Sequence, residues 1–238
     1  MRSIYFGVIL GLVFTFFVVT PARAAGLTVA QAQAIIALLQ AFDAEASVIA
    51  NVQHNLGIST SQVINEHRLG SPNATVVLTL YCSFESVYCT KIFPTLKKIL
   101  DEFGNQVAVV YRHMPLRQIF SQAEPAANAA ECIAEQLGND NFWIFAESIL
   151  THQDELSANY YTQEATRMGA DTAKFTLCAA ERKYQKVIDV DVAEAERQNV
   201  QGTPSIIMRN VYTGKREKID GALPHETIVV WVEKMLSQ

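Results

Sequence analysis

The chain has 238 residues, 50% of them hydrophobic and 18% charged, and its formal net charge is −5 at pH 7. This hydrophobic content is typical of a folded globular protein and excludes a largely disordered chain. The acidic balance excludes the basic footprint of a nucleic-acid-binding protein, so we expect no nucleic-acid partner. The length suits one substantial domain with an accessory segment.

The first 24 residues have the pattern of a secretory signal peptide. Arg2 precedes an apolar run over residues 4–19, and a small-residue site, Ala22-Arg23-Ala24, follows it. The alternative is an uncleaved membrane anchor, but the run is shorter than the roughly 20 residues that a spanning helix needs. In either case we expect the rest of the chain to lie outside the cytoplasm, in the periplasm or cell envelope, where disulfides persist. Contact with a membrane is expected only if this segment stays uncleaved.

Residues 25–69 are predicted to form an N-terminal helical segment. Thr28 and Gln31 fit a capping box, and apolar stripes run along two short helices, the second of which ends at Gly57. This helical hairpin packs either on the main domain or on a second copy of the chain, or it is a separate binding module. The sequence leaves these alternatives open, so a homo-oligomer formed through these helices is one of the expectations.

Residues 70–238 alternate strand and helix patterns. The apolar run Val76–Tyr81 predicts a strand buried on both faces, and it leads through a short turn into a helix, Lys91–Phe103, that stops at Gly104. The remaining predicted elements are a strand over 107–111, helices from 121 to about 200, a strand over 206–208, a hairpin turn at 212–215, a short strand at 218–219 and a helix over 224–236. The order is therefore β-α-β, a helical stretch, then β-β-α.

The turn between the first strand and the first helix carries the strongest motif, Cys82-Ser83-Phe84-Glu85-Ser86-Val87-Tyr88-Cys89. It resembles the DsbA/DsbG-type branch of the thioredoxin superfamily, whose members usually read Phe/Tyr-Ser-Asp-Phe-Glu-Cys-Pro-Tyr/Phe-Cys at this place. The Tyr-Arg-His-x-Pro-Leu ending of the second strand resembles the same branch. The resemblance implies an α/β thioredoxin-like fold over residues 70–238 with an inserted helical domain at about 119–200. It also implies activity as a thiol:disulfide oxidoreductase or isomerase.

The motif departs from the family pattern at its centre. The attacking cysteine falls on Ser86 and the following proline on Val87, whereas Cys89 keeps the position of the resolving cysteine. A serine hydroxyl is not appreciably ionised near neutral pH, and a helix dipole worth at most about 2 kcal/mol does not close that gap. Cys89 is therefore the candidate reactive group of an atypical Ser-x-x-Cys site, and an inert buried thiol is the alternative. The additional departures at Cys82 and Val87 favour natural divergence over an engineered substitution.

Cys82 offers a second arrangement of the site. It ends the predicted strand, and a turn separates it from Cys89. The two residues can therefore approach within the roughly 4.4–6.8 Å that separates the Cα atoms of a disulfide. A relocated redox pair, Cys82 with Cys89, is thus an alternative to a single reactive thiol.

Two further cysteines, Cys132 and Cys178, lie in the predicted helical insertion. Members of the resembling branch often carry a cysteine in each of these contexts, Ala-Ala-Glu-Cys and Phe-Thr-Leu-Cys. The resemblance thus implies a structural disulfide between them, and two unpaired buried thiols are the alternative.

No metal or other cofactor is expected. Cys82, Cys89 and His113 could converge, but the chain has no ligand spacing of the Cys-x-x-Cys or His-x-x-x-His kind. His113 is expected instead to cap the second strand or to pack at its end.

Thr203-Pro204 stands where the resembling family places a cis-proline, and there the backbone of the preceding residue accepts an extended substrate peptide. A purely structural turn is the alternative. The leading hypothesis is an exported DsbA-like protein that acts on the thiols or disulfides of extracytoplasmic proteins. Its expected partners are unfolded or cysteine-containing exported proteins and a redox partner protein. The rival hypothesis is a redox-inactive thioredoxin-like chaperone or assembly module that grips peptide through the same loop.

Overall fold

The structure is a computed structural model that describes residues 35, 38, 52 and 66–238. The chain divides into two compact units, Met1–Ile58 and Ser59–Gln238. Of the first unit only Ile35, Leu38 and Val52 are described, each in a helix. The predicted signal peptide and nearly all of the predicted N-terminal helical hairpin therefore lie outside the described residues. Within the described part, no helix is both long and apolar enough to cross a membrane.

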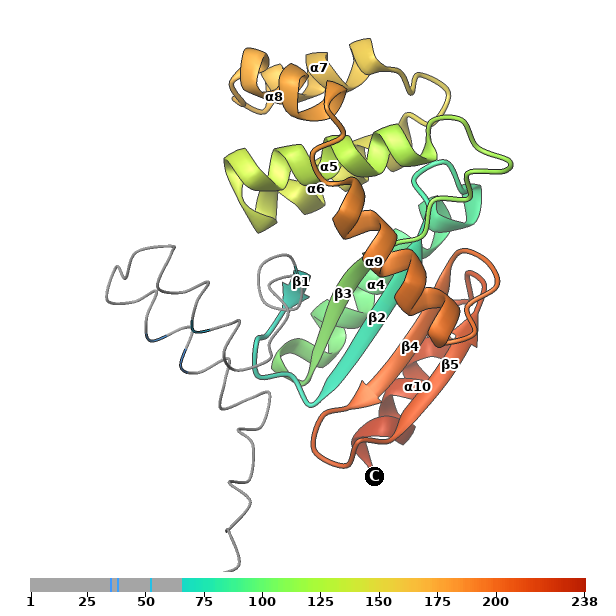
Figure 1. Cartoon of the computed structure of the whole chain (residues 1–238). Helices are drawn as coiled ribbons and strands as arrows, with labels where there is room; N and C mark the ends of the chain where they lie inside the picture. Colours follow the sequence, from blue (N-terminus) through green and yellow to red (C-terminus); the bar gives the residue numbers. More distant parts are fainter. Residues whose placement is uncertain (1–34, 36–37, 39–51, 53–65) are drawn as a thin grey trace, which may run out of the picture. The chain divides into compact units, whose positions relative to one another are not determined.

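Five strands of the second unit form one mixed sheet in the order β1-β3-β2-β4-β5 (Figure 1). Their bounds are β1 His67–Gly70, β2 Val76–Cys82, β3 Val107–His113, β4 Ser205–Asn210 and β5 Arg216–Asp220. β2 and β3 run parallel, and the other neighbouring pairs are antiparallel. β2 lies at the centre of the sheet with layers on both faces, which explains its continuous apolar sequence.

The crossover from β2 to β3 is helix α4, Val87–Phe103. It begins four residues earlier than the sequence pattern predicts, because the backbone carbonyl of Ser86 already accepts hydrogen bonds from the amides of Cys89 (2.9 Å) and Thr90 (3.3 Å). Ser86 is the N-cap residue, and Gly104 ends the helix with a φ of 51°. The first turn of α4 thus contains the second half of the cysteine motif.

The chain between β3 and β4 is helical. Its helices are α5 Ala123–Leu137, α6 Asn139–Thr151, α7 Ala158–Arg167, α8 Thr172–Ala180 and α9 Gln185–Arg197, and the chain closes with α10 His225–Leu236. Figure 1 shows α5–α8 grouped at one end of the sheet, with α9 on the front of the sheet and α4 and α10 behind it. This is the predicted thioredoxin-like arrangement with a helical insertion.

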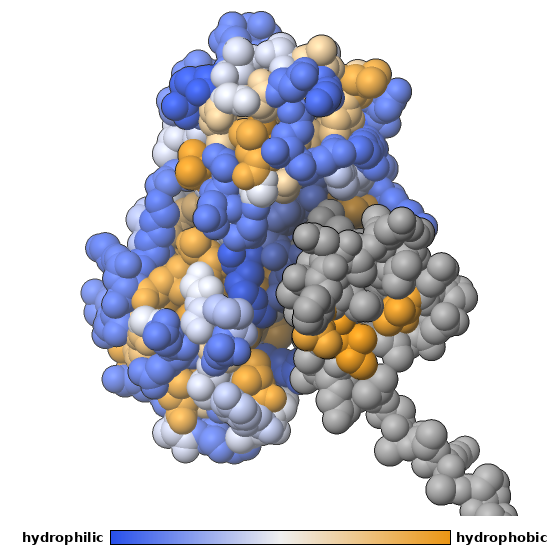
Figure 2. Space-filling view, turned by 90° about the vertical axis from the view of Figure 1, so that its left-hand side faces the viewer, coloured by the Kyte–Doolittle hydropathy of each residue, from blue (hydrophilic) through white to orange (hydrophobic). Residues whose placement is uncertain are grey.

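The main core lies between the sheet and α4, α6 and α10. Alternate residues of β2 and β3 point into it, among them Leu80 and Tyr111, which pair in register and are fully buried. A smaller cluster of Tyr81, Ala195 and Val200 lies on the opposite face, beneath α9. On the face seen in Figure 2, hydrophilic residues surround small apolar patches.

Strand β1 is the element that the sequence pattern does not predict. Its four residues pair antiparallel with β3, with His67 opposite Tyr111 and Gly70 opposite Ala108. The sheet therefore begins at His67, within the stretch that the sequence assigns to the N-terminal helical segment. Gly70, at a φ of 97°, makes the turn toward β2.

Candidate redox site

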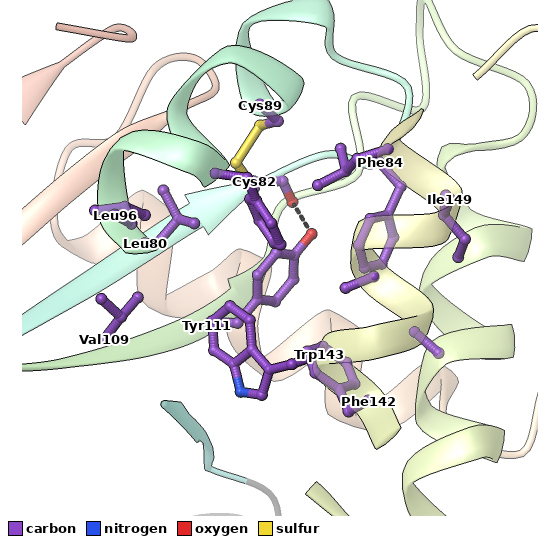
Figure 3. Packing of buried hydrophobic residues seen from close by; sticks show 14 of the residues in the cluster. Leu80, Cys82, Phe84, Cys89, Leu96, Val109, Tyr111, Phe142, Trp143 and Ile149 are labelled. Carbon is purple, nitrogen blue, oxygen red and sulfur yellow. Dashed lines mark hydrogen bonds between the residues drawn. A yellow bond between two sulfur atoms is a disulfide. The ribbon is translucent and has the colours of Figure 1, made fainter. Parts of the chain in front are cut away.

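The motif cysteines lie at the junction of β2 and α4. Cys82 is the last residue of β2, Cys89 lies in the first turn of α4, and a disulfide joins them with their Cα atoms 5.9 Å apart. All four cysteines of the chain are described, and none of them is free. The structure thus has the Cys82–Cys89 pair in place of a single Cys89 thiol (Figure 3).

The disulfide is deeply buried. The exposed fractions of Cys82 and Cys89 are 1% and 0%. The carbonyl of Cys82 accepts hydrogen bonds from the Tyr111 hydroxyl (3.2 Å) and the Met114 amide (2.9 Å), which hold the end of β2 in place. Figure 3 shows the bond from Tyr111 beside the sulfur atoms, with Phe84 close by. A thiolate from another molecule therefore reaches the sulfur atoms only if the motif turn moves.

Ser86 and the loop at Pro204 meet beside this disulfide. The Thr203–Pro204 peptide bond is cis, and the Ser86 hydroxyl donates a hydrogen bond of 3.3 Å to the carbonyl of Thr203. Ser86 itself is 4% exposed. The fold thus brings the altered nucleophile position and the predicted docking loop together across 117 residues of sequence.

An open pocket lies next to these two residues. Its volume is about 410 Å³, and Tyr88, residues 201–205 and residues 220–222 line it. Val87 and Tyr88, the two residues that precede Cys89, are each 56% exposed. The surface at the start of α4 is therefore apolar and borders the hollow at the cis-proline loop.

Three hydrogen bonds tie the motif segment to the helical insertion and the loop that precedes it. The carboxylate of Glu85 accepts from the amide of Gln122 at 2.5 Å, and the side-chain amide of Gln153 donates to the carbonyl of Phe84 at 2.7 Å. The hydroxyl of Thr90 donates to the carbonyl of Leu150 at 2.9 Å. These bonds therefore restrain the motif segment against the insertion.

The second disulfide joins Cys132 of α5 to Cys178 of α8, with Cα atoms 6.0 Å apart. Both residues are buried and both belong to the insertion. The two cysteines are 46 residues apart in sequence, and the bond links the helices that carry them. Its position is that of a structural crosslink.

His113 is the buried last residue of β3, and its imidazole packs beside Glu131 and His67 rather than forming a metal-ligand group with Cys82 and Cys89. Its Nε2 is 2.9 Å from Oε1 of Glu131, and Nε2 of His67 is 2.7 Å from the same oxygen. Burial alone raises the pKa of the Glu131 carboxyl, but the two imidazoles beside it outweigh burial and lower that pKa to about 2. Sequence reasoning missed this cluster because its members come from β1, β3 and α5 with no local spacing.

A second buried carboxylate, that of Asp191, forms hydrogen bonds with the end of β3 from the other face of the sheet. Asp191 of α9 accepts hydrogen bonds from the His113 amide (2.9 Å) and from the Arg112 guanidinium (3.3 Å). Burial raises the pKa of Asp191, and the charge of Arg112 opposes that effect. Asp191 thereby anchors α9 to the strand end that lies next to Cys82.

Solved structures of other proteins share this fold. Pseudomonas aeruginosa DsbA2 matches with a TM-score of 0.62 at 24% identity, over 72% of this chain and 94% of that one. Oxidised BdbD from Bacillus subtilis matches with a TM-score of 0.62 at 18% identity, over 73% of this chain and 94% of that one. These similarities confirm the predicted DsbA-like fold.

The family follows from the sequence itself. A family model described as thioredoxin matches residues 62–234, well over half of the chain, and the chain belongs to that family. Among curated proteins, the Na⁺/H⁺ antiporter NhaA 3 of Salinispora tropica is 34% identical over 143 residues. That alignment covers 60% of this chain but 21% of the antiporter, so the chain spans about a fifth of this relative.

Proposed function

We propose that this protein is an exported thiol:disulfide oxidoreductase whose exchangeable disulfide is Cys82–Cys89. The observation that carries the proposal is the position of that disulfide, at the β2–α4 junction beside Ser86 and the cis-Pro204 loop. Cys89 lies in the first turn of α4, where the helix dipole stabilises a thiolate. Cys89 is therefore the sulfur that we assign to the mixed disulfide, and Cys82 the resolving thiol.

The proposed exchange in the oxidising direction has two steps. A substrate thiolate attacks Sγ of Cys89, the Cys82–Cys89 bond breaks, and Cys82 leaves as a thiolate that takes up a proton. A second thiolate of the same substrate then attacks the substrate sulfur atom of the mixed disulfide, which forms the substrate disulfide and releases Cys89 as a thiolate. The substrate loses two electrons, the Cys82–Cys89 pair gains them, and a redox partner protein reoxidises the pair. Reduction of a substrate disulfide is the same sequence in reverse.

Substrate docking is assigned to the surface over the disulfide. The exposed Val87 and Tyr88 and the neighbouring pocket at Thr203–Pro204 suit an extended, unfolded peptide that carries a cysteine. Ser86 contributes a contact to the docking loop through its bond to the Thr203 carbonyl and has no role as a nucleophile. The partners are thus unfolded or cysteine-containing exported proteins, and the signal-peptide pattern of residues 1–24 supports export.

One observation favours a second candidate, a redox-inactive module that binds peptide through the same loop. Both sulfur atoms belong to residues that are at most 1% exposed, so a closed site protects the bond from attack. In that case the disulfide is a structural crosslink between β2 and α4, and the pocket beside Pro204 binds the peptide. Self-association through residues 25–69, one of the alternatives that the sequence leaves open, suits either candidate.

A single-turnover assay separates the two candidates. The oxidised protein is mixed with a reduced, unfolded model protein, and the loss of substrate thiols is followed over time. We expect wild type and Ser86→Ala to oxidise the substrate, and Cys82→Ala and Cys89→Ala to lose the reaction by at least about a hundredfold. If wild type fails to oxidise the substrate yet all four proteins bind it equally, the oxidoreductase proposal is wrong and the binding module stands.

A further inference from the structure

We propose that His67, His113 and Glu131 form a site for one divalent transition-metal ion, with Zn²⁺ as the representative ion. Each residue offers one ligand atom, and these three atoms lie within 4.8 Å of one another. All three residues are buried, with exposed fractions of 4%, 1% and 1%. The proposal is independent of the chemistry at Cys82 and Cys89.

The sheet register explains why these side chains converge. His67 of β1 lies opposite Tyr111 of β3, so the two side chains point to the same face of the sheet. His113 lies two residues beyond Tyr111 and therefore points to that face as well. Glu131 reaches the same place from α5, which belongs to the insertion.

Both imidazole nitrogens approach the same carboxylate oxygen of Glu131. Oε1 of Glu131 lies 2.7 Å from Nε2 of His67 and 2.9 Å from Nε2 of His113. These are hydrogen-bond distances, and the imidazole tautomers set which atoms carry the protons. A Zn²⁺ ion, which binds imidazole nitrogen and carboxylate oxygen at about 2.0–2.2 Å, would displace the protons between these atoms after a small outward movement of the three groups.

Packing holds both imidazole rings in place without an ion. The ring of His67 stacks on Phe142 with the centroids 3.5 Å apart and the planes 2° from parallel. The ring of His113 meets Tyr111 edge-on at 5.1 Å between centroids. Because the rings are fixed by aromatic neighbours, little ordering remains for the ion to impose.

The chemistry of the donor set selects the class of ion. Two imidazoles and one carboxylate suit Zn²⁺ and other first-row transition ions, whereas Ca²⁺ and Mg²⁺ prefer sites built from oxygen alone. Among the residues that the structure describes, none forms a hydrogen bond with the buried Nδ1 of His113, so no described bond on that side of the ring fixes its tautomer. The proton can therefore sit on Nδ1 and leave the Nε2 lone pair to the ion.

The site is suited to a structural role. The ion would join the first residue of β1, the last residue of β3 and the middle of α5, and so fasten the edge strand to the helical insertion. Three protein ligands leave one position for water, but the burial of all three residues keeps substrate away. The alternative is a hydrogen-bonded His–Glu–His triad that holds a proton in place of the ion.

The test is a Co²⁺ titration of the full-length, chelator-treated protein with both disulfides intact. We expect one equivalent of Co²⁺ to bind with the intense visible bands of a tetrahedral nitrogen–oxygen site, and Zn²⁺ to abolish those bands. His67→Gln should weaken binding at least a hundredfold, whereas the control His152→Gln, at an exposed histidine on the C-cap of α6, should bind as wild type does. The absence of tetrahedral bands, or equal binding by His67→Gln, would overturn the proposal.

A second measurement avoids dependence on a variant that fails to fold. X-ray absorption of the wild-type protein loaded with one equivalent of Zn²⁺ should show two imidazoles, the remaining ligands oxygen, and no sulfur. A sulfur ligand, or a shell of oxygen alone, contradicts the site.

Discussion

At the scale of single residues, Ser86 distinguishes this site from the family motif. Its hydroxyl touches the Thr203 carbonyl at the place where the family carries its attacking thiol. Ser86→Cys introduces a thiol at the N-cap of α4, where the helix dipole lowers a thiol pKa. We expect this variant to exchange disulfides at least about tenfold faster than wild type in a stopped-flow assay. Ser86→Ala is the matched control and should leave the rate nearly unchanged; a loss as complete as that in Cys89→Ala would contradict the assignment.

Titration of the Glu131 carboxyl makes the free energy of unfolding depend on pH. Its pKa is lowered from 4.5 to about 2, so the stability that its ionised form contributes is full above about pH 4.5 and is lost as the pH falls toward 2. One pKa unit is about 1.4 kcal/mol, so the loss is on the order of 3 kcal/mol. Chemical denaturation of chelator-treated protein should show this fall in wild type and a much flatter curve in Glu131→Gln. Parallel curves for the two proteins would show that the carboxylate does not carry the effect.

Residue identity alone could predict some of the site and not the rest. Cys89, Ser86 and Thr203-Pro204 stand out because each belongs to a contiguous motif. Spacing permits a Cys82–Cys89 bond but does not choose it over a free Cys89. His67 and Glu131 carry no local signal, because only the pairing of β1 with β3 and the packing of α5 bring them together.

At the scale of elements, Gly70 sets how closely β1 approaches α4. A Cβ atom at this position lies 2.8 Å from Cδ2 of Leu100 and 2.9 Å from the carbonyl oxygen of Val107, and φ is +97°. We expect Gly70→Ala to lower the free energy of unfolding by about 2–4 kcal/mol, because overpacking adds to backbone strain. Gly138→Ala is the control, since its φ of +84° brings the same kind of strain with nothing within 4 Å. Equal losses in the two variants would mean that the contact with Leu100 and Val107 is unimportant.

We expect the Cys132–Cys178 disulfide, which crosslinks α5 to α8, to stabilise the insertion. Its 46-residue separation corresponds to about 4 kcal/mol on the chain-entropy model. We expect the double variant Cys132→Ala/Cys178→Ala to lose most of that stability in thermal unfolding and to keep the exchange activity of Cys82–Cys89 at temperatures where it remains folded. An unchanged melting temperature would argue against this role.

Some helices and strands are marked by a local sequence pattern, whereas others depend on contacts with distant parts of the chain. β2, β3 and α4 are predicted because apolar runs and helical periodicity mark them within a few residues, and their observed bounds differ only at the ends. β1 is only four residues long and begins with the polar residues His67 and Arg68, so it carries no apolar strand pattern. It forms a strand because it pairs with β3. α9 has the helical pattern expected of the insertion, yet it packs on the sheet because Asp191 binds the end of β3.

At the scale of the whole molecule, the thioredoxin fold holds two disulfides of different kinds. Cys82–Cys89 closes a loop of 7 residues and Cys132–Cys178 a loop of 46, which correspond to about 2 and about 4 kcal/mol on the chain-entropy model. The shorter loop belongs to the junction beside the docking pocket, and the longer one to the insertion. We therefore expect a substrate dithiol to reduce the Cys82–Cys89 bond and to leave the Cys132–Cys178 bond intact.

The overall fold is well predicted from sequence because the family motif, the succession of strands and helices along the chain and the insertion all leave recognisable patterns over residues 62–234. The redox state of the site could not be predicted in the same way. The sequence identifies the cysteines but does not give the distance between their sulfur atoms. A buried pair of this kind exchanges only through motion of the turn over residues 83–86, which the hydrogen bonds of Glu85 and Gln153 restrain.

The most direct test is peptide-resolved mass spectrometry of thiol state, with the native protein alkylated before and after exposure to a reduced, unfolded substrate. We expect Cys82 and Cys89 to be linked before exposure and alkylated after it, while Cys132 and Cys178 stay linked throughout. A Cys82–Cys89 bond that survives substrate as completely as Cys132–Cys178, or a Cys89 that alkylates in the untreated native protein, would contradict the proposed exchange.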